Sequence, residues 1–484
     1  MNREFNDVIS GLNFISIYGR KNFQISGVVN DSRKARKNFI YVAILGNKLN
    51  GHDYINEAIE NGASAVFCSI IPKDINKNVT YVLVKNTQIA QGIIASNYYY
   101  NPSRNIDVVM VTGTNGKTTV VTLLYSLFRN LNIRVGMLTT IENKINDESH
   151  KSNLTTPDSI AINYYLNEMV KNNCRFCFME ASSHAIDQNR IVGIKIRGAI
   201  LTNISHDHLD YHSNFKDYIN AKKKLFDLLD TSSFALVNND DKRSHYILQN
   251  CIAKKHTYGI KTDSDYKTKI LTDSIEGLKI KIENNNIFLK LCGIFNAYNI
   301  LCVYAGSCIL GINKKHLLEQ ISKLDTPKGR FEFIKSTIGP TIVIDYAHTP
   351  DALENVLKTI HKFSLKGRII TVFGAGGNRD KSKRSLMGKI ASKYSNLLVL
   401  TSDNPRNENP QDIINDIKLG INKKVKIIQN KNRKNAIEKA ILEGRPEDII
   451  LIAGKGHEIY QEINGKKYPF DDKLVVEKIL SLKE

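Results

Sequence analysis

The segment VVMVTGTNGKTTVVTLL contains the residues best suited to binding a polyphosphate. Gly113 and Gly116 permit a tight turn whose backbone N–H groups can surround phosphate oxygens, and the positive end of the following helix adds to the attraction. Lys117 supplies a point charge, and Thr118 supplies a hydroxyl for Mg²⁺. The usual pattern GxxxxGK[ST] wants a glycine where this chain has Val111. We therefore predict a nucleotide-binding loop of a less common form.

Acidic and imidazole side chains that could hold a hard cation occur further along the chain. The apolar run FCFME ends in Glu180, which is either an exposed strand-end side chain or a carboxylate placed beside the phosphate loop. Histidines and aspartates then crowd into NISHDHLDYH, residues 203–212. That segment is compatible with a zinc site or with a polar loop. Beside a phosphate loop, one histidine that assists Mg²⁺ is the more economical interpretation.

The elements that must position these residues follow from the alternation of apolar strands and helical periods. Up to about residue 97 the pattern predicts a small α/β unit, and NYYYNPSRN marks a natural boundary. Strands and helices then alternate around the phosphate loop, which implies a mainly parallel sheet. The last block has four apolar strands that end in polar or glycine-rich loops, as in a doubly wound, Rossmann-like domain. We expect an α/β fold with three domains, 1–97, 98–327 and 328–484.

The bulk composition is that of an ordinary globular protein. The 484 residues are 42% hydrophobic and 24% charged, and no apolar run approaches the roughly 18 residues that a membrane span needs. The start, MNREFNDVIS, has no apolar signal core, so we expect a cytoplasmic protein. Scattered cysteines argue against a disulfide framework. Cys174 and Cys177 form a CxxC that could serve zinc or redox chemistry, but the strand-like CRFCFME favours plain packing.

The net charge of +20 raises the question of nucleic-acid binding, because a basic surface attracts phosphate. The lysines, however, are spread through an Ile-, Asn- and Lys-rich background, and there is no long basic tail. The basic segments 281–290 and 429–435 look like solvated surface. We therefore expect small anionic substrates and no nucleic-acid partner.

A series of ordered motifs along nearly the whole chain resembles the Mur ligases, the ATP-dependent amide-bond-forming family of peptidoglycan synthesis. The motifs are GTNGKTT (113–119), LTTPD (154–158), MEASSHAIDQNR (179–190), NISHDHLDYH (203–212), YINAKKKLF (218–226), GIFNAYN (293–299), GRFE (329–332), DYAHTPD (345–351), GAGGNRDKSKR (374–384), DNPR (403–406) and GKGHE (454–458). GTNGKT is the normal loop of this family, so Val111 only ends a buried strand. The resemblance implies that ATP phosphorylates a carboxylate to an acyl phosphate, which an amine then attacks.

The resemblance also implies which residues hold ATP and Mg²⁺. The ATP contacts are Gly113, Thr114, Asn115, Gly116, Lys117, Thr118, Thr119, Asn296, Asn299, Arg330 and Asp345. Lys117 would hold the β and γ phosphates, Thr118 and Glu180 one Mg²⁺, and His208 and Lys222 a second. An ammonium would repel Mg²⁺, so Lys222 is expected as a carbamate derived from CO₂. Its neighbours Lys223 and Lys224 are expected on a solvated helix face.

For the acceptor, the resemblance implies UDP-N-acetylmuramoyl-L-alanyl-D-glutamate, bound mainly by the first domain. The implied contacts are Asn30, Ser32, Asn47, Lys48, Leu49, Leu154, Thr155, Thr156, Ser182, Gln188 and Arg190. The first domain departs most from the family pattern, because GNKLNGHDY replaces a loop richer in histidine and glutamine. Leu154 stands where some members have asparagine, so only its backbone is expected to bind.

The amine that is added is inferred from the last domain. GAGGNRD is not a dinucleotide fingerprint, because Arg379 stands at the third glycine, and an arginine offers a bidentate clamp for a carboxylate. Meso-2,6-diaminopimelate carries a carboxylate and an ammonium at its far centre. A buried carboxylate needs a cation, and Arg406 fits, while Glu458 would take the ammonium. The implied diaminopimelate contacts are Arg379, Asp403, Asn404, Pro405, Arg406, Gly454 and Glu458.

Three other functions stay open from the sequence. A lysine-adding ligase and a folylpolyglutamate synthase share the same general chemistry. A nucleotide-dependent binding or regulatory protein would keep the loop without ligase activity. In all cases we expect small-molecule substrates and a monomer.

Overall fold

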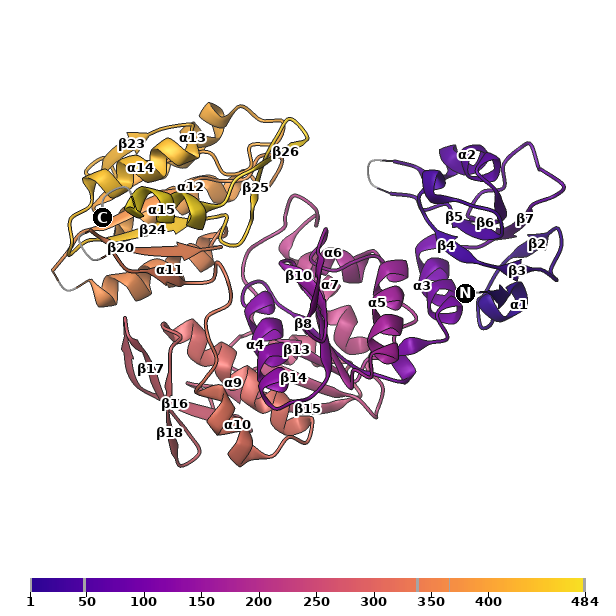
Figure 1. The fold of residues 1–484 in the computed structure, drawn as a ribbon, viewed down its shortest axis with the longest axis horizontal. Helices are drawn as coiled ribbons and strands as arrows, with labels where there is room; N and C mark the ends of the chain where they lie inside the picture. Colours follow the sequence, from indigo (N-terminus) through magenta and orange to yellow (C-terminus); the bar gives the residue numbers. More distant parts are fainter. Residues whose placement is uncertain (1, 47–48, 337–338, 365, 482–484) are drawn as a thin grey trace.

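The computed structural model describes residues 2–46, 49–336, 339–364 and 366–481. Three large β-sheets of five, eleven and six strands follow one another along the chain, and the part that contains the central sheet lies between the other two (Figure 1). The α/β fold with three domains is therefore confirmed, although the exact domain boundaries remain predictions. No helix in the described ranges is long and apolar enough to cross a membrane.

The N-terminal domain is a five-stranded sheet with helices on both faces. Its strands lie in the order β2-β7-β6-β5-β4, and β4 to β7 run parallel. The bounds are β2 Ser16–Tyr18, β4 Gly27–Val29, β5 Phe39–Val42, β6 Ala63–Cys68, β7 Thr80–Leu83, α1 Phe5–Val8, α2 Ile55–Glu60 and α3 Thr87–Tyr98. Helices α1 and α3 pack on one face and α2 on the other. The small α/β unit expected before residue 97 is present.

The central domain has an 11-stranded sheet in which β8, the strand before the phosphate loop, lies between β12 and β13. Strands β9, β12, β8, β13, β14 and β15 are parallel, as predicted. The strands are β8 Asp107–Thr112, β9 Val135–Leu138, β10 Glu142–Ile145, β11 Glu148–Lys151, β12 Phe176–Glu180, β13 Gly198–Leu201, β14 Phe234–Asn238, β15 Lys254–Gly259, β16 Tyr266–Ser274, β17 Gly277–Ile282 and β18 Asn285–Leu289.

Helices cover both faces of this central sheet. On one face lie α4, α9 and α10, and on the other lie α5 and α7. Their bounds are α4 Lys117–Asn130, α5 Ser159–Lys171, α6 Ser183–Asp187, α7 Phe215–Asp227, α8 Ser244–Ile247, α9 Ile294–Ile309 and α10 Lys314–Ile321. Cys174 and Cys177 are buried free thiols beside and within β12, so the packing interpretation of this CxxC is the one that fits.

The polar residues of the segment 281–290 are exposed, as its composition suggested, but most of its apolar residues are buried. It forms the turn and second strand of the β17–β18 hairpin, which extends the central sheet in antiparallel pairing. Ile280, Ile282, Ile287 and Leu289 alternate with exposed residues and enter the core beneath α9. The alternation satisfies the period of two that a half-buried strand requires.

The C-terminal domain is a six-stranded sheet in the order β19-β20-β24-β21-β22-β23, parallel except for β19. Helices α11, α12 and α13 cover one face, and α14 and α15 cover the other, which is the doubly wound arrangement expected. The bounds are β19 Glu332–Ile334, β20 Thr341–Asp345, β21 Ile369–Phe373, β22 Leu397–Leu400, β23 Lys426–Gln429, β24 Ile449–Ala453, β25 Tyr460–Ile463, β26 Lys466–Pro469, α11 Pro350–Phe363, α12 Ser382–Tyr394, α13 Pro410–Lys418, α14 Arg433–Glu443 and α15 Asp472–Ser481.

One residue of the basic segment 429–435 contradicts the expectation of solvated surface. The Arg433 side chain is fully buried and makes a two-pronged ion pair with Asp472, with N–O distances of 2.8 and 2.7 Å. Arg433 also donates to the carbonyl of Ala453. A buried guanidinium needs such partners, because an uncompensated charge in the core is costly.

Candidate active site

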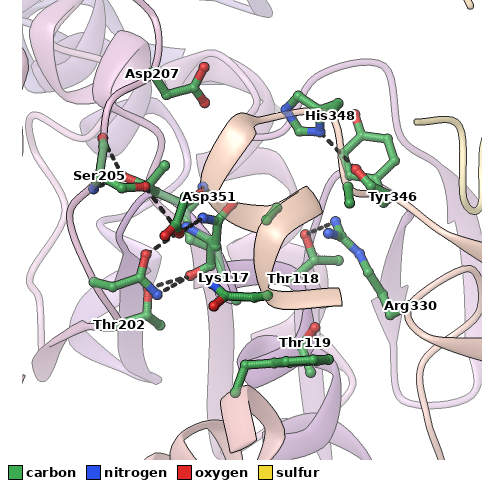
Figure 2. A pocket seen from close by; sticks show the side chains of 18 of the residues that line it. Lys117, Thr118, Thr119, Thr202, Ser205, Asp207, Arg330, Tyr346, His348 and Asp351 are labelled. Atoms are coloured by element: carbon green, nitrogen blue, oxygen red, sulfur yellow. Dashed lines mark hydrogen bonds between the residues drawn. The ribbon is translucent and has the colours of Figure 1, made fainter. Parts of the chain in front are cut away.

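A cavity of about 840 Å³ lies between the central and C-terminal domains. Its walls come from the carboxyl ends of β8, β12 and β13 on one side and from the loops after β20, β22 and β24 on the other. Figure 2 shows part of the cavity, where Lys117 and Thr118 of the central domain lie near Arg330 of the C-terminal domain. Parallel strands present their carboxyl ends at one edge of a sheet, and here two such edges face each other. The cavity therefore joins the phosphate loop to the DNPR and GKGHE motifs.

The phosphate loop needs its two glycines for steric reasons. Gly113 has a φ of +147° and Gly116 a φ of +87°, values that residues with a side chain rarely adopt. A β-carbon at Gly113 would fall on the hydroxyl of Thr202, and one at Gly116 would lie 2.8 Å from Asn299 Oδ1. Val111 is a buried residue within β8, as the family pattern implied.

The loop is held by the segment that follows β13, the strand beside β8 in the sheet. Thr114 N donates to the Asn203 carbonyl at 2.8 Å, and Asn115 N donates to Asn203 Oδ1 at 3.0 Å. Helix α4 begins at Lys117, and the N–H groups of a first helical turn have no partner within the helix. The first turn of α4 therefore has the backbone donors and the positive dipole end that suit a phosphate group.

Two lysines reach the same point of the loop. Lys117 Nζ donates to the Gly113 carbonyl at 2.9 Å, and Lys222 Nζ, from α7, donates to the same oxygen at 2.9 Å. Burial lowers the pKa of Lys117 and lowers that of Lys222 far more, and the Lys117 charge adds to the second effect. Lys223 is also buried, contrary to expectation, because it pairs with Asp227; Lys224 is exposed, as expected.

The expected Mg²⁺ ligands lie on the walls of this cavity. Glu180 is buried at the end of β12; its Oε1 accepts from Thr140 N at 2.8 Å, while Oε2 has no hydrogen-bond partner among the described residues. Thr118 Oγ accepts from Arg330 at 3.0 Å. Burial of a carboxylate oxygen without a partner costs free energy, which a bound cation would offset. Mg²⁺ prefers oxygen ligands and usually takes only one or two carboxylates from the protein. Glu180 and Thr118 thus fit Mg²⁺.

The histidine-rich segment does not assemble a zinc site. No three His, Cys, Asp or Glu side chains in the described part of the chain come together as metal ligands. Within the segment, His208 Nε2 lies 3.3 Å from Asp207, and burial holds the pKa of His208 well below its usual value. A neutral imidazole is the form that can bind a metal. Both residues line the cavity, close to Lys222.

The remaining expected ATP contacts also line the cavity. Asn296 and Asn299 are buried in α9, and Asn299 donates to Asn296 at 3.0 Å. The Arg330 guanidinium lies over the ring of Tyr346, 4.4 Å from its centroid. Asp345 ends β20, and its carboxylate accepts from two backbone N–H groups at 2.7 Å each. Burial raises the pKa of Asp345 to about 6.

Four residues expected to bind the acceptor form one network beside Glu180. Arg190 donates to the Thr156 carbonyl at 2.7 Å and to Gln188 Oε1 at 2.6 Å. Thr156 Oγ donates to the Glu180 carbonyl at 2.8 Å and also contacts the hydroxyl of Ser182. The network places a guanidinium within the same cavity as the phosphate loop. Thr155 and the exposed Leu154 also line that cavity.

The expected uridine contacts in the first domain lie apart from this cavity. Ser32 is buried, and its hydroxyl donates to Glu57 at 2.7 Å. Asn30 is exposed, and Leu49 is 66% exposed. Asn47 and Lys48 fall outside the described residues. The structure therefore does not bring these residues together with the central site.

The C-terminal wall holds the residues expected to bind the amine. Asn404 Nδ2 donates to Glu458 Oε2 at 2.8 Å, and the fully buried Lys455 donates to both side chains, at 3.1 and 2.9 Å. Arg406, with a φ of +50°, pairs with Glu462 at 3.1 Å and donates to the Gly377 carbonyl at 2.8 Å. Charged groups of both signs thus lie at this end of the cavity.

The other expected amine contacts complete this wall. Arg379 pairs across the domain interface with Asp210 at 3.3 Å. A β-carbon on Gly454 would collide with the Asp403 carboxylate, so glycine is required there. Asn404, Asp403, Arg379 and Gly454 line the cavity, whereas Pro405 shapes the turn without lining it.

Several cavity residues were not singled out from the sequence. Asp351 lies inside a recognised motif, DYAHTPD, so its presence was visible but its contacts were not. Lys383, within GNRDKSKR, is buried with its Nζ 3.9 Å from Asp207 of the central domain. These contacts join residues more than a hundred positions apart and leave no local pattern.

Comparisons with known proteins match the whole chain. Residues 24–110 match the family model described as Mur ligase family, catalytic domain; residues 111–306 match the Mur ligase middle domain; and residues 329–456 match the Mur ligase, glutamate ligase domain. A UDP-N-acetylmuramoyl-L-alanyl-D-glutamate--2,6-diaminopimelate ligase of Cytophaga hutchinsonii is 46% identical over 480 residues, 99% of each chain. The chain belongs to the Mur ligase family.

Solved structures of Mur ligases have the same fold. A UDP-N-acetylmuramoyl-L-alanyl-D-glutamate--2,6-diaminopimelate ligase is 30% identical with a TM-score of 0.69, and the match covers 100% of this chain and 99% of that one. The MurF ligase of Thermotoga maritima in complex with ADP is 17% identical with a TM-score of 0.64, and the match covers 94% and 98% of the two chains. In this Mur ligase the phosphate loop, Glu180 and Lys222 line the same cavity.

Proposed function

We propose that this Mur ligase adds meso-2,6-diaminopimelate to UDP-N-acetylmuramoyl-L-alanyl-D-glutamate with hydrolysis of ATP to ADP, as a step of peptidoglycan precursor synthesis. The observation that carries the proposal is the single cavity that runs from the phosphate loop to Arg379, Arg406 and Glu458. The Cytophaga hutchinsonii relative, which is similar to this chain over 99% of both lengths, is named for the same substrates, and this supports the proposal. Action as a cytoplasmic monomer stays a prediction.

The chemistry begins with a carboxylate, which is a poor electrophile. The γ-carboxylate of the D-glutamyl unit attacks the γ-phosphorus of ATP; the bond to the β-phosphate oxygen breaks and ADP leaves. Lys117, with the first turn of α4, neutralises charge on the transferred phosphoryl group. Arg330, which reaches Thr118 from the C-terminal domain, adds a second cation. Mg²⁺, when held by Thr118 and Glu180, would supply further charge neutralisation at the phosphates.

The second half of the reaction joins the amine. The neutral amino group attacks the acyl carbon, inorganic phosphate leaves, and the amine loses a proton as the amide forms. Holding both reactants in one cavity makes this step effectively intramolecular. The C-terminal wall would orient diaminopimelate by its far centre, with Arg406 on the carboxylate and Glu458 on the ammonium.

Lys222 has the properties that carbamate formation requires. Only an uncharged amine adds to CO₂, and the product is an anionic carbamate with release of a proton. Burial, together with the Lys117 charge, holds the pKa of Lys222 well below that of a free lysine, which favours the neutral amine. The lysine nitrogen lies beside the Gly113 carbonyl, and a carbamate there would carry anionic oxygens in place of a cation. These oxygens, together with His208, would hold the second Mg²⁺.

The deciding experiment measures ADP release with the nucleotide acceptor and one amine at a time. Meso-diaminopimelate is expected to support the fastest release, and L-lysine a much slower one. Fastest release with lysine would overturn the assignment of Arg406. Release that depends on a folate acceptor and glutamate would replace the proposal with a folylpolyglutamate synthase. ADP release without any amine, or none at all, would favour a nucleotide-dependent regulatory protein.

A further inference from the structure

The first turn of α11 in the C-terminal domain contacts the tip of the phosphate loop. Asn115 Nδ2 donates to Asp351 Oδ2 at 2.8 Å, and the Thr349 hydroxyl donates to Asn115 Oδ1 at 3.4 Å. Ser205, also in the central domain, donates to the same Asp351 oxygen at 3.3 Å. Figure 2 shows Asp351 facing Ser205, beside Lys117. Both polar atoms of the Asn115 side chain therefore bond to the other domain.

The backbone of Asn115 is already committed to the central domain. Its N–H donates to Asn203 Oδ1 at 3.0 Å, and its carbonyl accepts from Asn203 Nδ2 at 3.0 Å and from the Thr202 hydroxyl at 2.6 Å. Such bonds fix the loop at this residue, two positions before Lys117. Anything that moves the Asn115 side chain therefore strains the loop that holds the phosphates, and the side chain itself serves the domain contact.

The position of Asp351 suits a carboxylate that accepts across an interface. Asp351 is the second residue of α11, where the positive end of the helix dipole favours a negative charge. Thr349 caps the helix by accepting from Ala352 N at 3.2 Å and keeps its own proton for Asn115. Position 349 thus supplies a donor and position 351 an acceptor, the pair that an amide side chain requires.

We propose that Asp351 is a positioning residue that ties docking of the C-terminal domain to the conformation of the phosphate loop. When α11 contacts Asn115, the C-terminal wall of the cavity and the phosphate loop reach their working positions together. The inference rests on the proposed function, because it assumes that phosphoryl transfer and amine attack occur in the same cavity. Asp351 acts through Asn115 and touches neither reacting centre.

The test is a double-mutant cycle of Asn115→Ala and Asp351→Ala, measured as kcat for diaminopimelate-dependent ADP release. Each single change is expected to lower kcat about tenfold, since misplacement of a catalytic element costs one to two orders of magnitude. The double variant should lose no more than the worse single variant, because both break one contact. Losses that multiply would overturn the coupling, as would single variants with unchanged kcat.

Two further variants separate hydrogen bonding from general damage. Asp351→Asn keeps an acceptor oxygen and should retain most of kcat; a loss as deep as that of Asp351→Ala would overturn the hydrogen-bond role. Glu354→Ala removes an acid from the next turn of α11. Glu354 itself does not line the cavity, since it faces Lys358 and the hydroxyl of Tyr394, and its loss should leave kcat unchanged. A loss with Glu354→Ala equal to that with Asp351→Ala would mean that α11 is merely sensitive to substitution, and would overturn the proposal.

A readout without any amine keeps this inference distinct from the proposed function. Small-angle scattering with ADP and Mg²⁺ should give a larger radius of gyration for Asp351→Ala than for the unaltered chain, because docking is weakened. Equal radii would overturn the docking role. If the unaltered chain released no ADP with diaminopimelate but the radii still differed, the proposed function would fail and the docking contact would stand.

Discussion

Lys222 is unusual because its environment works against the charge that a lysine normally carries. The side chain is 1% exposed, and its Nζ donates to the Gly113 carbonyl, which also accepts from Lys117. Two ammonium groups on one oxygen repel each other, and this repulsion disfavours the charged form of Lys222. Burial and the Lys117 charge lower the pKa of Lys222, which favours the neutral amine that the proposed reaction with CO₂ needs.

Replacing Lys222 by alanine is expected to lower kcat by roughly 100-fold or more, a size typical for loss of electrostatic stabilisation in an active site. ATP binding should persist, because Lys117 and the loop remain. Short carboxylic acids added to the assay should restore part of the activity by replacing the carbamate oxygens. Lys223→Ala is the matched control, since Lys223 is buried but pairs with Asp227. Unchanged turnover in Lys222→Ala would refute the carbamate.

Arg406 provides a second prediction, about the choice of amine. Its guanidinium is fixed by Glu462 and the Gly377 carbonyl and lines the cavity. Arg406→Ala should raise the KM for diaminopimelate about tenfold or more, because a desolvated carboxylate would lose its charged partner. The KM for ATP should change little. Steady-state kinetics with each substrate varied in turn would check this, and equal increases in both constants would contradict it.

The elements around the phosphate loop could be predicted because their signals are local. An apolar strand, a glycine-rich turn and a helix start are all written within seventeen neighbouring residues, and the ends of β12, β20 and β24 follow the same rule. Burial of charge could not be predicted, since it depends on distant partners. Arg433 is buried because Asp472 meets it, and Asn115 contacts Asp351 from the far side of the cavity.

The turn between β8 and α4 gives a prediction about one of its glycines. Gly113→Ala forces a side chain into a φ of +147° and onto the Thr202 hydroxyl, which itself bonds the loop carbonyl at Asn115. We expect at least tenfold weaker ADP binding by calorimetry, with loop distortion as the cause. Gly311→Ala, at a site with a φ of +83° and no neighbouring atom within 4 Å of the new β-carbon, is the control for a positive φ without a steric clash. Equal affinities in Gly113→Ala and the unaltered chain would contradict the steric argument.

The central and C-terminal domains meet through charged side chains as well as through α11. Asp380 lies 3.3 Å from His206, Arg379 lies 3.3 Å from Asp210, and Lys383 lies 3.9 Å from Asp207. The first two pairs are partly exposed and add little stability, whereas the Lys383–Asp207 pair is buried; the alternating signs of the three favour one docked orientation. The interface therefore specifies how the domains meet, while the buried residues of each domain provide most of the stability.

Two buried histidines of the C-terminal domain, His348 and His457, make the stability of the whole molecule depend on pH. Burial lowers the pKa of His348 to about 4 and that of His457 to about 3, from 6.5 in an unfolded chain. Below pH 6.5 the unfolded chain binds protons that the folded chain does not, so stability is full above 6.5 and falls toward pH 4. The slope of the unfolding free energy against pH should approach about 1.4 kcal/mol per pH unit for each histidine.

Urea unfolding of the ligand-free protein between pH 7 and 4.5 should show a shallower slope in the double variant His348→Gln/His457→Gln. His316→Gln, on exposed surface of α10, should keep the original slope. A double variant with an unchanged slope would mean that other groups cause the acid sensitivity.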